Sequence, residues 1–163
     1  MRVRESSSRR RTLSEKSLLF SLLLSAKWSV MFKALSKYSD LGLLAGRVGL
    51  GVMYVLHGWP KLAAGQAAWE KYGHAMASIG IAFFPKFWGL AAGLSELAGG
   101  ILLILGLLYR PACFFIGITM FVGFMSLFRS GHGFNDFSRP LEMTLVFLIL
   151  LFVGPGKYSF DKG

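Results

Sequence analysis

The chain has 163 residues, of which 54% are hydrophobic and 15% aromatic, and its formal net charge is +10. A soluble domain of this length does not bury so much apolar side chain, so the composition excludes an ordinary soluble protein and indicates a membrane protein. The positive charge does not indicate nucleic-acid binding. Seven of the 18 Lys and Arg residues lie in the first 30 residues, and most of the others flank apolar segments.

Residues 1–30 form a basic extension whose apolar stretch, 18–24, is too short to cross a bilayer. The basic start, with its SRRRTL sequence, is typical of an export signal, but the residues at 27–28 are Lys and Trp where a cleavage site needs small residues. The alternative is a disordered or dispensable tail, with translation beginning at Met31. We expect residues 31–163 to form the folded domain.

Four apolar segments follow the extension, and they lack the alternating pattern of barrel strands. The fourth is short, and we expect it to begin a turn earlier, at 138–140, because proline is tolerated in a first helical turn. The sequence therefore predicts an all-α membrane protein, a four-helix transmembrane bundle with helices at about 41–58, 87–108, 111–128 and 139–153.

Two charged residues, Arg47 and Glu96, stand inside the first and second apolar segments. An acid at the centre of a spanning helix costs on the order of 3 kcal/mol or more to insert, so a partner is expected. Counting residues from the helix starts places the two backbones within about 7 Å of each other in depth. We therefore predict an intramembrane Arg47–Glu96 pair, which is either a structural contact that specifies helix pairing or a proton or ligand site.

Glycines recur at spacings of three and four on the helix faces that carry these two charges. Small residues at that spacing let another helix approach closely. The predicted helix-packing glycines are Gly42, Gly46, Gly51, Gly58, Gly89, Gly93 and Gly100.

A second group of polar residues is expected at the membrane surface where the first helix ends. It consists of His57, Lys61, Glu142 and His132, and it predicts a pocket that faces lipid headgroups. Each member also has a simpler explanation, as an interface anchor, a helix-terminus charge or a solvated loop residue. The histidines lack metal-ligand spacing, although His57 and His132 leave haem ligation open as an alternative. The single cysteine, Cys113, excludes an internal disulfide and a cysteine-ligated cluster, so no metal and no intrinsic cofactor is evident.

The sequence resembles the DoxX family of small bacterial inner-membrane proteins over essentially all of residues 31–163. The matching pieces are RVGLGVMYVLHGWPKL, LSELAGGILLILGLLYR, the acidic residue of RPLEMTL and the closing GPGKYSFDKG. The resemblance implies four transmembrane helices in the plasma membrane and adds Gly99 to the packing glycines and Arg110 in a cytoplasmic turn. Its characteristic positions are Arg47, His57, Gly58, Lys61, Glu96, Gly99, Gly100, Arg110 and Glu142.

Three functions remain open from the sequence. The resemblance implies a membrane subunit or accessory of a quinone-linked redox system, concerned with sulfur or thiol compounds or with oxidative stress. Since the chain carries no evident electron carrier, an oxidoreductase partner would have to supply the electrons. The alternatives are a non-enzymatic assembly protein, as a monomer or a homo-oligomer, and a small transporter or channel.

The distribution of Lys and Arg predicts that both termini are cytoplasmic. With four spans, the side that holds both termini carries 12 of these residues and the opposite side carries 5. A cysteine placed at Lys71 or Ser130 should then react with an impermeant reagent in intact spheroplasts, and one placed at Lys162 should not. The parent chain, with Cys113 alone, is the control, and the opposite labelling pattern would reverse the orientation.

Overall fold

The computed structural model describes residues 27–29, 32–33 and 36–161. The chain divides into two compact units, residues 1–39 and 40–163. In the first unit, residues 27–29 and 32–33 are helical, and the rings of Trp28 and Phe32 stack with their centroids 6.0 Å apart. The prediction of a dispensable extension over residues 1–30 lies outside the described residues, apart from 27–29.

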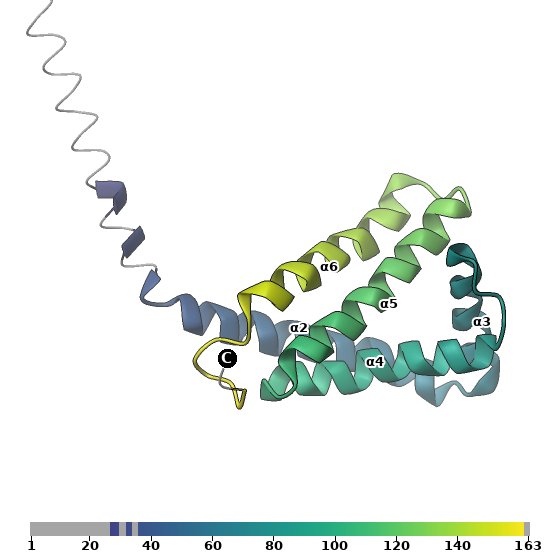
Figure 1. Cartoon of the computed structure of the whole chain (residues 1–163), viewed down its shortest axis with the longest axis horizontal. Coiled ribbons are helices and arrows are strands. Elements are labelled where there is room, and N and C mark those ends of the chain that lie inside the picture. Colours follow the sequence, from purple (N-terminus) through teal and green to yellow (C-terminus); the bar gives the residue numbers. More distant parts are fainter. Residues whose placement is uncertain (1–26, 30–31, 34–35, 162–163) are drawn as a thin grey trace, which may run out of the picture. The chain divides into compact units, whose positions relative to one another are not determined.

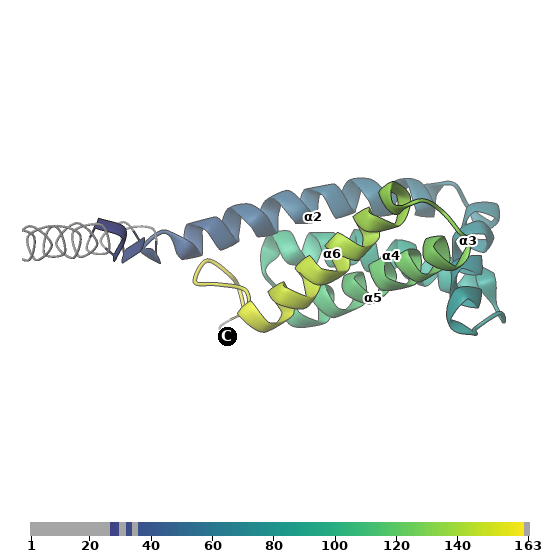
Figure 2. The same cartoon turned by 90° about the horizontal axis from the view of Figure 1, so that it is seen from above.

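The second unit consists of helices that run back and forth along one another (Figures 1 and 2). No strand occurs among the residues that the structure describes, so the prediction of an all-α membrane protein is confirmed. The elements are α2 (Ser39–Ala63), α3 (Gln66–Gly73), the 3-10 helix η1 (His74–Ile79), α4 (Pro85–Leu105), α5 (Tyr109–Arg129) and α6 (Phe134–Val153).

Three of the described helices, α2, α4 and α5, are long and apolar enough to cross a membrane. Helix α6 has 20 residues, but its first half carries Asp136, Arg139 and Glu142. It packs along α5 over much of its length (Figure 2). The presence of four spans therefore stays a prediction, and it depends on whether α6 crosses the membrane.

Two helix ends differ from the predicted ones, and both differences affect the polar residues. Helix α2 does not end at Gly58 but continues through Pro60 to Ala63, which puts Lys61 in its last turn. Helix α4 ends at Leu105, three residues before the predicted end, because Gly106 adopts φ +65°. Glycine reaches this left-handed conformation without steric cost and commonly ends helices in this way.

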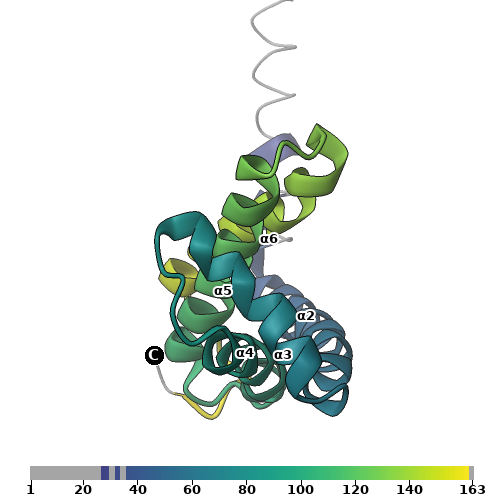
Figure 3. The same ribbon diagram turned by 90° about the vertical axis from the view of Figure 1, so that its right-hand side faces the viewer.

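The sequence analysis did not predict α3 and η1, which occupy the connection between α2 and α4 (Figure 3). Helix α3 packs against α4 so closely that a Cβ atom on Gly73 would collide with the carbonyl oxygen of Pro85. A Cβ on Gly89 would likewise collide with the carbonyl oxygen of Trp69. Because backbone atoms form both contacts, side-chain rearrangement cannot relieve them. The connection is thus a packed layer at one end of the bundle.

Helices α2 and α4 approach each other through glycines. A Cβ on Gly51 would lie 2.6 Å from the carbonyl oxygen of Gly100, and a Cβ on Gly58 would lie 2.5 Å from the amide nitrogen of Leu97. A Cβ on Gly93 would lie 2.8 Å from Leu62 Cδ2 of α2. Four of the predicted packing glycines therefore form the α2–α4 contact, where small residues allow the backbones to meet.

The remaining predicted glycines behave differently. Gly42 and Gly46 are exposed, and a Cβ on either would meet nothing within 4 Å, so their predicted packing role is wrong within the described residues. The two lie before the point at which α4 reaches α2. Gly99 faces α5, where a Cβ would lie 2.8 Å from Ile116 Cδ1.

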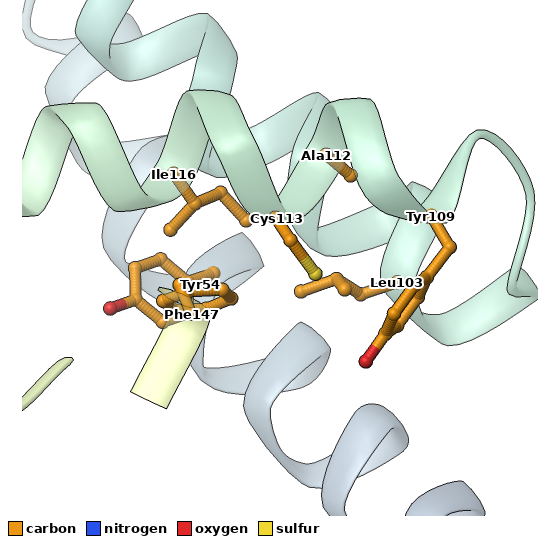
Figure 4. Close-up of a cluster of buried hydrophobic side chains, with 7 residues drawn as sticks. All are labelled: Tyr54, Leu103, Tyr109, Ala112, Cys113, Ile116 and Phe147. Atoms are coloured by element: carbon orange, nitrogen blue, oxygen red, sulfur yellow. The ribbon is translucent and has the colours of Figure 1, made fainter. Parts of the chain in front are cut away.

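The buried core joins all four long helices (Figure 4). Tyr54 of α2 is 4% exposed, and its ring lies edge-on to Phe147 of α6 with the centroids 4.9 Å apart. Ser95 of α4 and Thr119 of α5 share a hydrogen bond of 2.7 Å between their hydroxyl groups. The other members of the core are Leu103, Tyr109, Ala112, Cys113 and Ile116.

The glycine contacts predict the effect of adding one methyl group to each face of α2. Gly58→Ala should destabilise the bundle by roughly 1–3 kcal/mol, because the new Cβ would overlap the backbone of α4. Gly46→Ala is the matched control on the same helix and should be neutral or slightly stabilising, since alanine favours helix and the site is open. Unfolding in detergent measures both, and equal effects would show that α2 and α4 do not meet at Gly58.

Candidate functional site: a buried carboxylate–lysine pair

Glu96 lies in the middle of α4 and is fully buried, with 0% of its surface exposed. Its Oε1 accepts a hydrogen bond of 2.5 Å from Nζ of Lys61, which closes a salt bridge between α2 and α4. Glu96 thus has the charged partner that its position requires, and that partner is not Arg47. The predicted Arg47–Glu96 pair is wrong.

The α2–α4 register explains this correction. A Cβ on Gly106 would collide with the guanidinium of Arg47, so Arg47 lies level with the end of α4. Gly106 follows Glu96 by ten residues, which is about 15 Å along a helix. Lys61 was predicted as a surface residue because α2 was expected to end at Gly58, and the longer helix brings it to Glu96.

Lys61 connects the buried acid to the surface. Its side chain is 23% exposed, whereas that of Glu96 is wholly enclosed. Its Nζ also lies 5.2 Å from the centroid of the Tyr72 ring in α3, a favourable cation–π distance. The ammonium group therefore contacts side chains from two other helices, and Lys61 is the partly exposed member of the pair.

The second carboxylate oxygen of Glu96, Oε2, is buried and has no hydrogen-bond partner among the described residues. A buried acceptor without a partner typically costs about 1–3 kcal/mol, and more when it is charged. Such atoms are rare in native proteins and are found where a proton, a water molecule or a ligand completes the site. Glu96 is accordingly a candidate for such a site.

Arg47 has a different role at the other end of α2. It is 2% exposed, and it donates hydrogen bonds from Nη1 to the carbonyl oxygen of Pro155 at 2.9 Å and from Nη2 to that of Tyr158 at 2.5 Å. The guanidinium group thus fastens the loop after α6 to α2. Two carbonyl dipoles stabilise the buried charge, and the planar fork of arginine suits a pair of acceptors.

The structure does not assemble the predicted polar cluster at the membrane surface. Lys61 turns inward to Glu96, while His57, Glu142 and His132 are all exposed. No hydrogen bond or ion pair joins these three in the described part of the chain, and the only ring near His57 is that of Tyr54, at 6.4 Å. Arg110 is exposed at the start of α5, beside the turn that follows α4.

Two structural features were missed by sequence reasoning. The first is the loop 154–161, in which Asp161 accepts a hydrogen bond of 2.8 Å from the backbone nitrogen of Tyr109. Its sequence, GPGKYSFD, stood out in the resemblance but had no assigned partner. The second is an apolar cavity of about 190 Å³ between α5 and α6, lined by Cys113, Phe114, Gly117, Ile118, Phe121, Thr144, Phe147, Leu148 and Leu151.

The contacts predict which charge pairs are energetically coupled. Lys61→Met and Glu96→Gln should each destabilise the bundle, by between about 1 kcal/mol, typical of polar contacts in membranes, and 3–5 kcal/mol for a broken buried pair. Their double variant should lose less than the sum of the two. Arg47→Met combined with Glu96→Gln is the control cycle and should be additive, because the two side chains have separate partners. If only the Arg47–Glu96 cycle is non-additive, these two side chains interact after all and the Lys61–Glu96 pair is wrong.

Comparison with known proteins agrees with this description. The sequence model of the DoxX family matches residues 42–129, more than half of the chain. Inner membrane protein YqjF of Escherichia coli K12 is 30% identical over 131 residues, which cover 78% of this chain and 95% of that protein. Inner membrane protein YphA of the same organism is 29% identical over 140 residues, which cover 77% and 96%.

An uncharacterized protein of Haemophilus influenzae is 30% identical over 134 residues, 78% of this chain and 94% of that relative. No solved structure matches the chain significantly. The matched region contains Arg47, Lys61, Glu96 and the three helices that can span a membrane. The chain therefore belongs to the DoxX family and is an all-α integral membrane protein.

Proposed function

We propose that the protein is an inner-membrane accessory subunit of a quinone-linked redox system and that the Lys61–Glu96 pair is its proton-exchange site. One observation carries the proposal: Glu96 is fully buried in a candidate spanning helix with Oε2 unpartnered, while its partner Lys61 is partly exposed. The names of the Escherichia coli relatives support the inner-membrane location. The charge distribution supports cytoplasmic termini.

The proton chemistry follows from the two ends of the pair. Lys61 is the member of the pair closer to the outside, because Glu96 has no exposed surface. Transfer across the hydrogen bond between Nζ and Oε1 converts an ammonium–carboxylate pair into a neutral amine and a carboxylic acid. In a low-dielectric interior the neutral form avoids the cost of two desolvated charges. The neutral amine of Lys61 then takes a proton from outside, so that the pair has gained one proton and Glu96 holds it.

The described residues offer a binding site for only part of a quinone. The cavity between α5 and α6 is apolar and suits an isoprenoid tail, but the hydroxyl of its Thr144 already bonds to the carbonyl oxygen of Pro140 at 2.8 Å. Glu96 does not line this cavity. A quinone would supply two-electron, two-proton redox chemistry. We propose that an oxidoreductase partner holds the ring and supplies the electrons, and that this chain contributes the proton site.

A non-enzymatic assembly protein is the second candidate, and the contacts of Arg47 favour it. Through Nη1 and Nη2, that buried cation donates to two carbonyl oxygens of the closing loop and fastens the loop to α2 without any ligand. In this alternative, the Lys61–Glu96 pair likewise serves only to fix α2 against α4. The two candidates differ in whether Glu96 exchanges protons.

Difference infrared spectroscopy of the full chain in liposomes distinguishes the two candidates. A pH step should produce a protonated-carboxyl band from a buried acid, and Glu96→Gln should remove it. Glu142→Gln removes an exposed carboxylate and is the matched control, so the band should persist. If the parent chain shows no such band across the folded pH range, Glu96 is only a structural partner and the proton-site proposal fails.

Co-purification tests the redox partner separately. Extraction of the full chain in mild detergent, followed by mass spectrometry of proteins and lipids, should recover an oxidoreductase together with quinone. The Glu96→Gln variant should retain the partner, since the residue is internal. Recovery of the chain with lipids alone would favour the assembly function.

A further inference from the structure

A cavity of about 480 Å³ lies at the end of the bundle where α6 finishes and α5 begins. Most of its wall is the closing loop of the chain, and the rest comes from the ends of these two helices. Its lining residues are Arg110, Val153, Gly154, Pro155, Gly156, Lys157, Ser159 and Asp161. This cavity is separate from Glu96 and plays no part in the proposed proton exchange.

The wall of the cavity is held in place at several points. Besides the two hydrogen bonds from Arg47, the backbone nitrogen of Asp161 donates to the carbonyl oxygen of Gly106 at 2.9 Å. The backbone nitrogen of Lys157 lies 3.3 Å from Oδ1 of Asp40, at the start of α2. The loop is therefore fastened to α2 and to the α4–α5 turn, so the cavity is formed before any ligand arrives.

The charges in the wall favour an anion. Arg110 and Lys157 are both exposed, and neither side chain has a hydrogen bond or ion pair within residues 36–161. The one acid in the wall, Asp161, already accepts the backbone N–H of Tyr109 through Oδ2. Two unpaired cations therefore face a single acid that is partly satisfied. A phosphate group, which accepts several charge-assisted hydrogen bonds, suits such a site.

The position of the cavity favours a lipid as the source of that phosphate. Val153 forms its apolar edge, and the neighbouring Phe152 is 77% exposed at the end of α6. Leu107 and Leu108, in the turn before α5, are exposed as well. An acyl chain could lie against these side chains while the headgroup occupies the loop. Basic pockets at the ends of transmembrane helices are typical headgroup sites.

We propose that this cavity binds the phosphodiester headgroup of an anionic glycerophospholipid, with Arg110 and Lys157 as its ligands. The inference does not depend on the redox function. A free phosphate-bearing solute has the same headgroup chemistry but no acyl chains, so the apolar edge would add nothing to its binding. The expected ligand is therefore phosphatidylglycerol or another anionic lipid, preferred over both a zwitterionic lipid and inorganic phosphate.

Native mass spectrometry of the full chain in a neutral detergent tests the proposal. The protein should retain phosphatidylglycerol more tightly than phosphatidylcholine. The double variant Arg110→Gln, Lys157→Gln should weaken phosphatidylglycerol binding by roughly tenfold or more, since each basic group near an anionic headgroup contributes. Inorganic phosphate at matched concentration should not displace the lipid. Both substitutions are on exposed side chains, and a melting curve in detergent confirms that the variant remains folded.

Arg129→Gln is the matched control, because Arg129 is an exposed cation at the opposite end of the same helix, α5. It should leave phosphatidylglycerol binding at this site unchanged. An equal loss in Arg129→Gln and in the double variant would overturn the proposal, since the binding would then reflect overall charge. Equal retention of phosphatidylcholine would also overturn it. Displacement by inorganic phosphate would replace the lipid with a soluble phosphate ligand.

Discussion

The backbones of α2 and α4 meet at Gly51, Gly58, Gly93 and Gly100, and this contact determines the polar interior of the protein. In a membrane, helices gain no hydrophobic driving force from each other, so association depends on close packing and on polar contacts. Because backbone atoms of the two helices touch at these glycines, α2 cannot shift along α4 without steric overlap. Once the register is fixed, Lys61 lies beside Glu96 and Arg47 lies beside Gly106. Each buried charge therefore meets the partner that the register brings to it.

Arg47 and Lys61, both in α2, have partners of different chemistry. Arg47 donates to two neutral carbonyl oxygens of the closing loop, an arrangement that suits the planar fork of arginine. Lys61 faces a carboxylate, and a proton can move between the two groups. The first contact is therefore suited to holding the fold together. The second is suited to changing its charge state, which is why the proposed chemistry is assigned to Glu96.

These features lie at different levels of the bundle. The closing loop and its cavity lie at the end that holds the α4–α5 turn, and Lys61 points towards the end covered by α3. Between them lies the buried cluster around Tyr54 and Phe147, whose members are all hydrophobic (Figure 4). In the proposed function a proton on Glu96 would exchange through the Lys61 end, while the proposed lipid headgroup at the other end would stabilise the loop without entering the interior.

The sequence by itself determined the class of protein, the approximate helices and the residues that matter, since long apolar segments, an acid at their centre and glycine spacing are local properties. Glu96, Lys61, Arg47 and four of the packing glycines were all identifiable from it. It did not determine their partners. Pairing depends on register, and register depends on where α2 ends and on backbone contacts between residues about 40 positions apart in the chain. The folding back of the closing loop onto Arg47, over 108 residues, likewise appears only in the tertiary structure, because no local pattern encodes which carbonyl oxygens a buried arginine will meet.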